Sequence, residues 1–264
     1  AKGITADCVR AMAETFRCKF ILVGRSALGT EPSWAQDQEA GTVLKRSAMR
    51  ALQAAGEKPL PRTVQRMVNA VQSQREIRQT LSDVQAMGAE VHYLSADVTD
   101  ALALRTALEP LVSQTGPITG ILPGAGLLAD KLIAHKTAAD FAAVYDVKLQ
   151  GLLAVTQAID IGRLQQVVLF FCGAGFYGNV GQADYAIANE ILNRAAFLFQ
   201  QNHPDTRVVS INWGAWEAGM VSPALKKVFE AHGVSLVPSE EGPWALVDQL
   251  SEQLAGQTQV ILGG

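Results

Sequence analysis

The sequence of 264 residues has little net charge and few cysteines or aromatic residues. Lysine and arginine number 22 against 25 acidic residues, so the net charge is -3 and no overall field favours nucleic acid. The three cysteines, Cys8, Cys18 and Cys172, are too few for a disulfide framework, and no two of them form a Cys-x-x-Cys pair. We therefore expect a reducing, cytoplasmic setting and no nucleic-acid partner.

Long hydrophobic runs are absent as well. The longest apolar stretches, such as residues 167–171, fall far short of the roughly 20 residues that cross a bilayer. The first residues do not have the pattern of a signal peptide, because Ala1, Lys2 and Gly3 lead directly into an amphipathic stretch. We therefore expect no membrane span and no membrane partner.

The composition is that of a packed globular protein, with 48% apolar and 18% charged residues. Short apolar runs typical of strands buried in a parallel sheet occur at 20–23, 91–96, 118–122, 167–171, 208–211 and 260–262. Helical stretches separate them, at 4–16, in pieces between 38 and 87, and at 101–113, 138–159 and 184–201. This alternation predicts an α/β fold with a Rossmann-like doubly wound parallel sheet, which binds ligands at the carboxyl ends of its strands.

One segment, about residues 27–80, is longer than a crossover helix needs, and we predict an inserted helical segment there. Its basic residues include Lys45, Arg46, Arg50, Arg62, Arg66, Arg75 and Arg78. These side chains either contact a partner or form a solvated helical face, and the second interpretation is the commoner one for a charged helix.

Three positions near the ends of apolar runs are candidates for binding a nucleotide. Gly3 precedes a helix and suits the last glycine of a phosphate-binding turn, although a lone glycine is commonly only a turn. Arg25, directly after the run at 20–23, is either a residue that favours NADPH or an ordinary loop residue. Asp97 could contact the adenine, or an acid or threonine there could cap the helix that starts near residue 101.

The most informative pattern surrounds a tyrosine. Tyr185 and Asn189 lie four residues apart, on one face of a helix, and Cys172 ends a strand 13 residues before Tyr185. This pattern resembles the short-chain dehydrogenase/reductase superfamily, and within it the ketoreductase domains of polyketide and polyunsaturated fatty acid synthases. The resemblance covers nearly the whole chain and rests on Gly24-Arg25-Ser26, Asp97-Val98-Thr99-Asp100, Gly124-Ala125-Gly126, Ala129-Asp130-Lys131-Leu132-Ile133, Val147-Lys148-Leu149-Gln150-Gly151, Gly175-Phe176-Tyr177-Gly178-Asn179 and Asn212-Trp213-Gly214-Ala215-Trp216 with Gly219-Met220.

The resemblance implies catalytic roles for four residues. Tyr185 would be the general acid that protonates the substrate carbonyl oxygen. Lys148 would assist it as a nearby ammonium group, Asn189 would order the proton relay, and Cys172 would occupy the position that polarises the carbonyl. Without the resemblance, Lys148 would be interpreted as an exposed helix lysine.

The resemblance also implies a cofactor and the residues around it. The cofactor is NADPH, and the residues that bind it would be Gly3, Arg25, Ser26, Asp97, Val98, Gly124, Ala125 and Gly126. The residues of the substrate site and its lid would be Asp130, Tyr177, Gln182, Trp213, Gly219 and Met220, with a lid helix at 222–232. No metal ion is implied.

The chain departs from the family pattern around the substrate. Cys172 stands where the family has a serine that donates to the carbonyl, and a thiol is a weak donor. Loss of one such donor slows a reaction by roughly 10²–10³. Phe171 replaces a second common serine, and Pro123 replaces a common histidine. Ala129 replaces the first acid of a Leu-Asp-Asp motif whose second acid is kept as Asp130, and we expect the D-hydroxy product.

The resemblance places one strand and two glycines before Ala1. We therefore expect residues 1–264 to be a single ketoreductase catalytic domain with its first strand upstream, inside a longer multidomain synthase. Residue 1 is then a boundary within that synthase.

The sequence as a whole predicts an NADPH-dependent β-ketoacyl reductase. It would reduce a β-ketoacyl thioester on an acyl carrier protein to the β-hydroxyacyl thioester, with the carrier and neighbouring synthase domains as partners. The alternative is a degenerate, non-reducing structural domain of such a synthase, which the departure at Cys172 favours and the retained Tyr185 and Lys148 oppose. A stand-alone dehydrogenase for alcohols or sugars fits less well, because Asn189 replaces the lysine usual four residues after the tyrosine.

Overall fold

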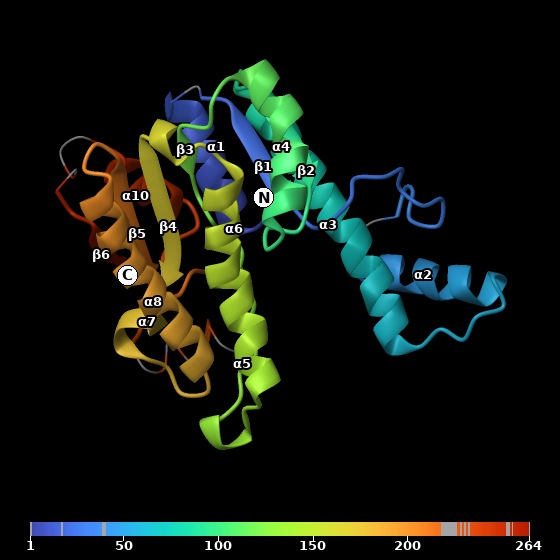
Figure 1. Cartoon of the computed structure of the whole chain (residues 1–264). Coiled ribbons are helices and arrows are strands. Elements are labelled where there is room, and N and C mark those ends of the chain that lie inside the picture. Colours follow the sequence, from blue (N-terminus) through green and yellow to red (C-terminus); the bar gives the residue numbers. More distant parts are fainter. Residues whose placement is uncertain are drawn as a thin grey trace.

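Strands and helices alternate along the chain, and every strand pair is parallel (Figure 1). The structure is a computed structural model that describes residues 2–16, 18–38, 41–217, 226–227, 229, 231, 233–251, 254 and 256–263. The strands are β1 (Phe20–Gly24), β2 (Val91–Ser95), β3 (Gly120–Ile121), β4 (Gln166–Cys172), β5 (Arg207–Trp213) and β6 (Gln259–Leu262). The predicted α/β class with Rossmann-like parallel sheets is confirmed.

The helices also follow the predicted order. They are α1 (Ile4–Phe16), α2 (Thr42–Ala54), α3 (Pro61–Ala86), α4 (Ala101–Thr115), α5 (Ala138–Tyr145), α6 (Gly151–Ala158), α7 (Ala174–Tyr177), α8 (Ala183–Asn202) and α10 (Gly242–Gln249), with the short turns η1 (Ile133–His135), η2 (Asp146–Gln150) and η3 (Ile161–Arg163). No helix in the described part of the chain is long and apolar enough to cross a lipid bilayer.

The strands form two sheets and not the one sheet that the sequence predicts. β1 pairs with β2, from Phe20 beside Val91 to Gly24 beside Ser95. The second sheet has the order β3, β4, β5, β6. A continuous sheet needs neighbouring strands about 4.8 Å apart, and no strand among the described residues pairs with both β1 and β3.

Helix α1 joins the two sheets. Val9 and Ala13 pack with the buried residues of β1 and β2, whereas Cys8 packs with the buried residues of β4 and β5. Met12 contacts both groups. The apolar side chains of α1 are removed from water only when both sheets pack against the helix. Burial of α1 therefore stabilises the association of the two sheets.

Both faces of the second sheet are covered, because alternate residues of a strand point to opposite sides. Val167, Leu169 and Phe171 of β4 pack with residues of α5, η2 and α8. Val168, between them in the sequence, packs with residues of α1 and α10. Phe171 therefore points to the side on which Tyr185 of α8 lies.

The helix predicted at 138–159 is divided into α5, the π-helical turn η2 and α6. It begins with a capping box, in which the Thr137 hydroxyl accepts from the Asp140 N–H and the Asp140 carboxylate accepts from the Thr137 N–H. The wider turn of η2 leaves Lys148 and Leu149 buried. Turns of this kind interrupt α-helices often at functional sites.

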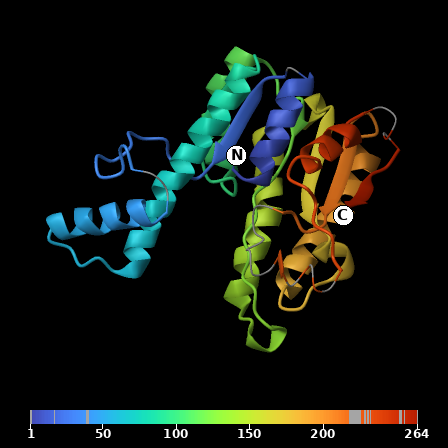
Figure 2. The same ribbon diagram turned by 180° about the vertical axis from the view of Figure 1, so that it is seen from behind.

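The predicted insertion consists of a loop, α2 and the first half of α3. We call residues 41–71 the arm. With Ala35, the arm buries a separate apolar core that shares no residue with the cores of the sheets: Leu44, Ala48, Leu52, Val64, Val68 and Val71. Figures 1 and 2 show that the arm extends from one side of the molecule.

Candidate active site

The predicted catalytic residues meet near the carboxyl end of β4. Cys172 is the last residue of this strand, Tyr185 and Asn189 lie in the first turns of α8, and Lys148 lies in η2. The side chains of Tyr185 and Phe171 share one apolar cluster with Leu149 of η2. Three separate elements of the fold thus bring these residues together.

The Lys148 ammonium is buried against aromatic rings. Its Nζ lies 5.0 Å from the centroid of the Tyr185 ring and 5.2 Å from that of Phe171, close enough for cation–π attraction. Burial lowers the pKa of Lys148 from 10.5 to about 8, and the nearby Cys172 acts in the opposite direction. At neutral pH the side chain is therefore mainly a cation, placed beside the phenol.

Tyr185 is 9% exposed. Burial, with a further contribution from the Cys172 thiol, raises the pKa of Tyr185 to about 12, and the Asn189 carboxamide opposes this shift. The phenol consequently keeps its proton at neutral pH, which is the form that a proton donor requires.

Asn189 is fully buried beneath α7. Its Nδ2 donates to the Tyr185 carbonyl oxygen at 2.7 Å, and its Oδ1 has no hydrogen-bond partner among the described residues. Gly175 of α7 makes this packing possible, because a Cβ at that position would lie 2.7 Å from the Asn189 Cβ. A buried acceptor without a partner is costly, so the Asn189 Oδ1 is a site where a donor or water would bind.

The segment after β3 is attached to the start of α8. The Lys131 N–H donates to the Gly181 carbonyl oxygen at 2.9 Å, and Gln182 Nε2 donates to the Asp130 carboxylate at 3.0 Å. Two predicted substrate residues, Asp130 and Gln182, are therefore in direct contact. Asp130 also contributes to the raised pKa of Tyr185.

A buried ion pair strengthens this attachment. Lys136 Nζ lies 2.7 Å from Asp184 Oδ1, and the two side chains are 6% and 0% exposed. The same Nζ donates to the Ala129 carbonyl oxygen at 2.8 Å, and Asp184 Oδ1 accepts from the Tyr185 N–H. This pair holds the segment at 129–136 against the residue that precedes Tyr185.

The predicted cofactor residues form a path from α1 to Lys148. A Cβ on Gly124 would lie 2.8 Å from Thr5 Oγ1, so this glycine packs directly against the first turn of α1. A Cβ on Gly126 would lie 3.8 Å from the Cε of Lys148. A glycine-lined surface beside a helix N-terminus is suited to a dinucleotide, and Ala125 between the two glycines is exposed.

At Gly3 the fit is only partial. Gly3 has a positive φ of 54°, as a tight turn before a helix requires. Its N–H, however, donates to the exposed Glu76 carboxylate at 2.7 Å. The amide thus binds an anionic group, and a phosphate would have to displace Glu76 from it.

The other predicted cofactor residues follow β1 and β2. Arg25 is exposed and lowers the pKa of Asp97, although the largest causes of that lowered pKa are hydrogen bonds from Thr99. The N-cap of α4 is Asp100 and not Asp97, because the Asp100 side chain accepts from the Ala103 N–H. The Ser26 carbonyl oxygen accepts from the Tyr93 hydroxyl, and Val98 packs against Gly151, where a Cβ would lie 3.5 Å from it.

Two predicted substrate or lid residues, Trp213 and Tyr177, are not part of this buried cluster. Trp213 is 2% exposed and packs with Trp216 in the core on the opposite face of the sheet. The family resemblance implied a site residue at Trp213, but the alternation of side chains along β5 turns its ring into that core. Tyr177 is 74% exposed, at the end of α7. Gly219, Met220 and most of the predicted lid helix lie outside the described residues.

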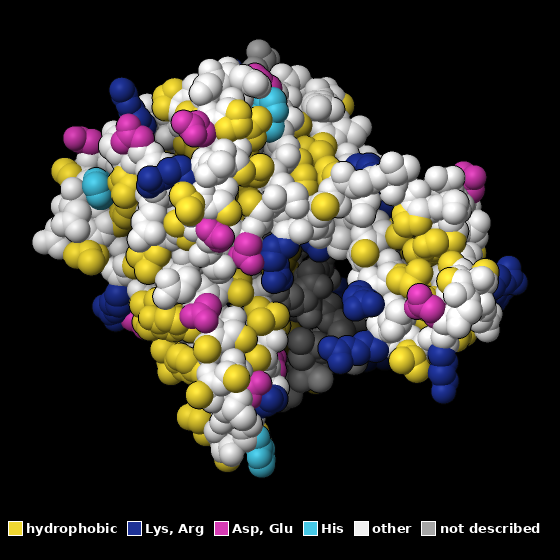
Figure 3. Space-filling view, turned by 45° about the vertical axis from the view of Figure 1, so that its right-hand side comes forward, with side chains coloured by type: hydrophobic (Ala, Val, Ile, Leu, Met, Phe, Trp, Pro, Cys, Tyr) yellow, Lys and Arg dark blue, Asp and Glu magenta, His cyan; other side chains and the backbone are white. Residues whose placement is uncertain are grey.

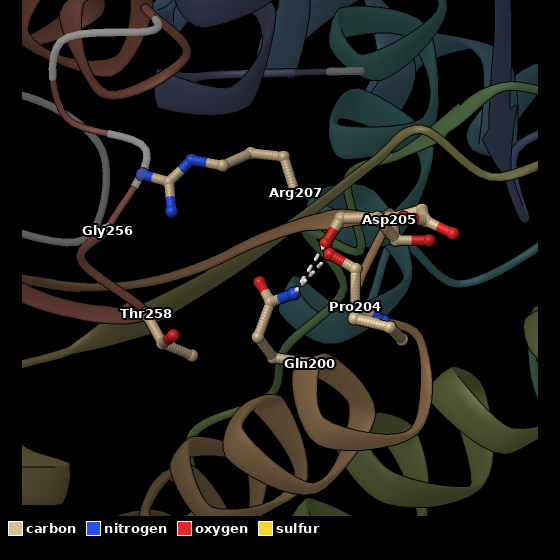
Figure 4. Close-up of a pocket in the computed structure, with 7 residues that line it drawn as sticks. Gln200, Pro204, Asp205, Arg207, Gly256 and Thr258 are labelled. Carbon is tan, nitrogen blue, oxygen red and sulfur yellow. Dashed lines mark hydrogen bonds between the residues drawn. The ribbon is translucent and has the colours of Figure 1, made fainter.

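One cavity lies at the amino ends of the strands, away from the predicted catalytic residues. It has a volume of about 390 Å³ and is lined by Gln200, Pro204, Asp205, Thr206, Arg207, Gly256 and Thr258 (Figure 4). Arg207 begins β5, whereas Trp213 at the other end pairs with Cys172. The Arg207 guanidinium donates to backbone carbonyl oxygens, including that of Leu254 at 2.7 Å. Among the described residues no group of His, Cys, Asp and Glu could hold a metal ion.

Comparisons with known proteins agree with this arrangement. The profile of the family described as KR domain matches residues 1–218. The chain is 38% identical over 250 residues to one component of the polyunsaturated fatty acid synthase of Thraustochytrium sp., and the match covers 92% of this chain and 9% of that protein. The chain therefore spans less than a tenth of the length of this curated relative.

Two solved structures have the same fold. One is an N-terminal ketoreductase from the macrolactin assembly line, with a TM-score of 0.72 and 23% identity over 98% of this chain and 42% of that chain. The other is a ketoreductase domain from the bacillaene assembly line, with a TM-score of 0.71 and 24% identity over 98% of this chain and 53% of that chain.

Replacement of one partner of the buried ion pair should destabilise the protein strongly. Lys136→Met leaves the Asp184 carboxylate buried without a cation, and we expect a loss of about 3–5 kcal/mol in the free energy of unfolding. Urea denaturation measures this loss. Lys131→Met is the matched control, because its pair with Asp140 is exposed and should be worth about 1 kcal/mol or less. In the Lys136→Met protein, the second replacement Asp184→Asn should restore most of the lost stability. Equal losses in Lys136→Met and Lys131→Met would contradict the interpretation.

Lys148→Met should stabilise the folded protein at neutral pH by roughly 3 kcal/mol, because a shift of one pKa unit corresponds to about 1.4 kcal/mol. The pKa of Lys148 is lowered in the folded state, so the unfolded chain binds more protons between about pH 8 and 10.5. Stability of the unmodified protein therefore rises with pH across this window, and the advantage of the variant should disappear there. Denaturation at neutral pH and at pH 10.5 tests this, and a difference that does not change with pH would contradict it.

Proposed function

This chain belongs to the KR domain family, and on that premise we propose that it is an NADPH-dependent β-ketoacyl reductase. The substrate is a β-ketoacyl thioester on an acyl carrier protein of a multidomain synthase, and the product is the β-hydroxyacyl thioester. The observation that carries the proposal is the buried, protonated Tyr185 beside the Lys148 ammonium at the carboxyl end of β4. The partners are the carrier and the neighbouring domains of the synthase.

Reduction of the ketone adds a hydride to the carbonyl carbon and a proton to the carbonyl oxygen. NADPH, when bound, supplies the hydride. The Tyr185 hydroxyl donates the proton, and the negative charge left on its oxygen is stabilised by the Lys148 ammonium. Because both side chains are buried, this charge stabilisation acts with little screening by water.

The positions of other residues support the same reaction. The thiol of Cys172 lies near both Lys148 and Tyr185 and would donate to the substrate carbonyl, weakly. Asn189 has a buried acceptor that can bind the water through which Tyr185 regains its proton. Gly124 and Gly126 are the residues that would hold the cofactor between α1 and Lys148, and the exposed Arg25 is the residue that would bind its 2′-phosphate.

The surface around this cluster is suited to an acyl chain. Leu132 and Ile133 after β3 are 55% and 76% exposed, and Phe176 and Val180 after β4 are 58% and 85% exposed. The hydrogen bond from Lys131 to Gly181 holds these two segments together. Exposed apolar side chains that gather beside a polar site are typical of ligand-binding surfaces.

Tyr185→Phe should reduce turnover of a short β-ketoacyl thioester by about 10²-fold or more, because the phenol is the proton donor. The assay is NADPH oxidation by the intact protein, together with NADPH binding measured by fluorescence. Binding should be unchanged, since the replacement removes only the hydroxyl. Equal turnover by Tyr185→Phe and the unmodified protein would overturn the assignment of this residue.

The alternative is a non-reducing structural domain of a synthase, and Cys172 is the observation that favours it. Cys172→Ser restores an oxygen donor at the carbonyl and should raise a measurable rate by roughly 10-fold or more, because one such donor is worth about 10²–10³. NADPH oxidation by both proteins decides between the functions. No turnover by either protein, although NADPH binds, would support the structural domain.

A further inference from the structure

The arm carries a positive charge that the rest of the chain does not share. Residues 41–71 contain six basic side chains and one acidic side chain, Glu57, so the arm has a charge of +5 while the whole chain has -3. The six are all exposed: Lys45, Arg46, Arg50, Lys58, Arg62 and Arg66. In Figure 3 Lys and Arg side chains lie over the arm, several of them where it faces the body of the molecule.

These charges have no counter-ions within the described part of the chain. None of the six basic residues forms an ion pair or a hydrogen bond with another described side chain. Arg75, at the base of the arm, differs from them: it pairs with Glu31 and donates to the carbonyl oxygens of Ala35 and Gln38 at 2.7 and 2.8 Å. Arg75 thus fixes the loop, whereas the arm's own cations face solvent.

Apolar side chains are exposed between these cations. Val43, Met49 and Leu60 are 43%, 42% and 50% exposed. Arg46 and Arg50 follow Val43 at helical spacing on α2, so they share one face of that helix. Apolar side chains among basic ones favour a protein partner, because the exposed apolar surface adds to the charges a contact that a phosphate backbone does not use. The arm also contains no aromatic side chain on which the bases of a single strand could stack.

The arm projects beyond the edge of the sheet where Tyr185 and Cys172 lie. α3 has 26 residues and is about 39 Å long, whereas β2 beside it has five residues and is about 17 Å long. α3 ends just before the amino end of β2 and packs against it through Val84. Its first half therefore extends roughly 20 Å past the carboxyl end of β2. Figures 1 and 2 show the arm projecting away from the two sheets.

We propose that the exposed face of α2, formed by Val43, Arg46, Met49 and Arg50, is the docking surface for an acidic face of the carrier that presents the thioester. This inference rests on the proposed function. The arm's separate core keeps its two helices in a fixed arrangement. Its cations attract the carrier and its apolar side chains contact it. The arm acts on substrate delivery and not on the chemical step.

The test compares a carrier-bound substrate with a free one. The double variant Arg46→Glu/Arg50→Glu, in the intact protein, should raise the KM for a 3-oxobutanoyl group on an acyl carrier domain by about 10-fold or more at low salt. Its kcat/KM for the cysteamine thioester of the same group should stay within about two-fold, because the site is unchanged. Added salt should reduce the difference.

A matched control reverses two arginines away from the arm. Arg163→Glu/Arg194→Glu changes the net charge by the same amount at exposed positions of η3 and α8, and it should leave both substrates within about two-fold. Circular dichroism and thermal unfolding confirm that each variant is folded. An equal loss in the control, or an equal loss for the free thioester, would overturn the proposal.

A binding measurement separates this proposal from the proposed function. If neither substrate is reduced, fluorescence anisotropy of the labelled carrier still reports docking: weaker binding by Arg46→Glu/Arg50→Glu alone supports the arm even though the reductase assignment fails. Unchanged carrier affinity overturns the arm proposal. The proposal is also overturned if the protein binds duplex DNA or anionic phospholipid vesicles more tightly than it binds the carrier. It is overturned as well if the only effect of the double variant is a loss of self-association in light scattering.

Discussion

The burial of the Lys148 ammonium is the constraint on which the rest of the site depends. An ammonium group seldom leaves water without a carboxylate partner, and here two aromatic rings replace it. That environment depends on the π-helical turn that leaves Lys148 buried and on the strand end that supplies Phe171. Burial of the Lys148 ammonium lowers the stability of the folded protein, and the same burial holds a cation next to the Tyr185 phenol.

A second polar interaction determines where that phenol lies. The pair of Lys136 and Asp184 joins the segment after β3 to the start of α8, so the substrate loop and the helix that carries Tyr185 form one unit. The two sheets are joined differently, by the apolar contacts of α1. Electrostatic contacts thus fix the site locally, while hydrophobic burial holds the larger parts of the molecule together.

Apolar runs ending in glycine or polar residues predicted all six strands, because buried parallel strands require such runs. The tyrosine pattern predicted that Tyr185, Asn189 and Cys172 lie together, since strand ends and helix starts meet at one edge of a sheet. Lys148 followed only from the family resemblance, because the sequence alone does not distinguish it from an exposed helix lysine. The division into two sheets depends on which strands pair, and the inward ring of Trp213 depends on which face of the sheet the side chain occupies. One apolar run specifies neither. The ion pair of Lys136 and Asp184 had no signal, because its partners lie 48 residues apart and each resembles a surface residue.

The length of α3 gives the arm a mechanical property. Its second half is held against α1 by the bonds from Arg10 to Asp83 and from Gly3 to Glu76, and its first half lies beyond these contacts. A tilt of about 10° at that support would move the tip, some 20 Å away, by roughly 3–4 Å. A force applied to the tip of the arm therefore also acts on the contacts between α3 and α1. One of these contacts is the hydrogen bond from Gly3, directly before α1, to Glu76.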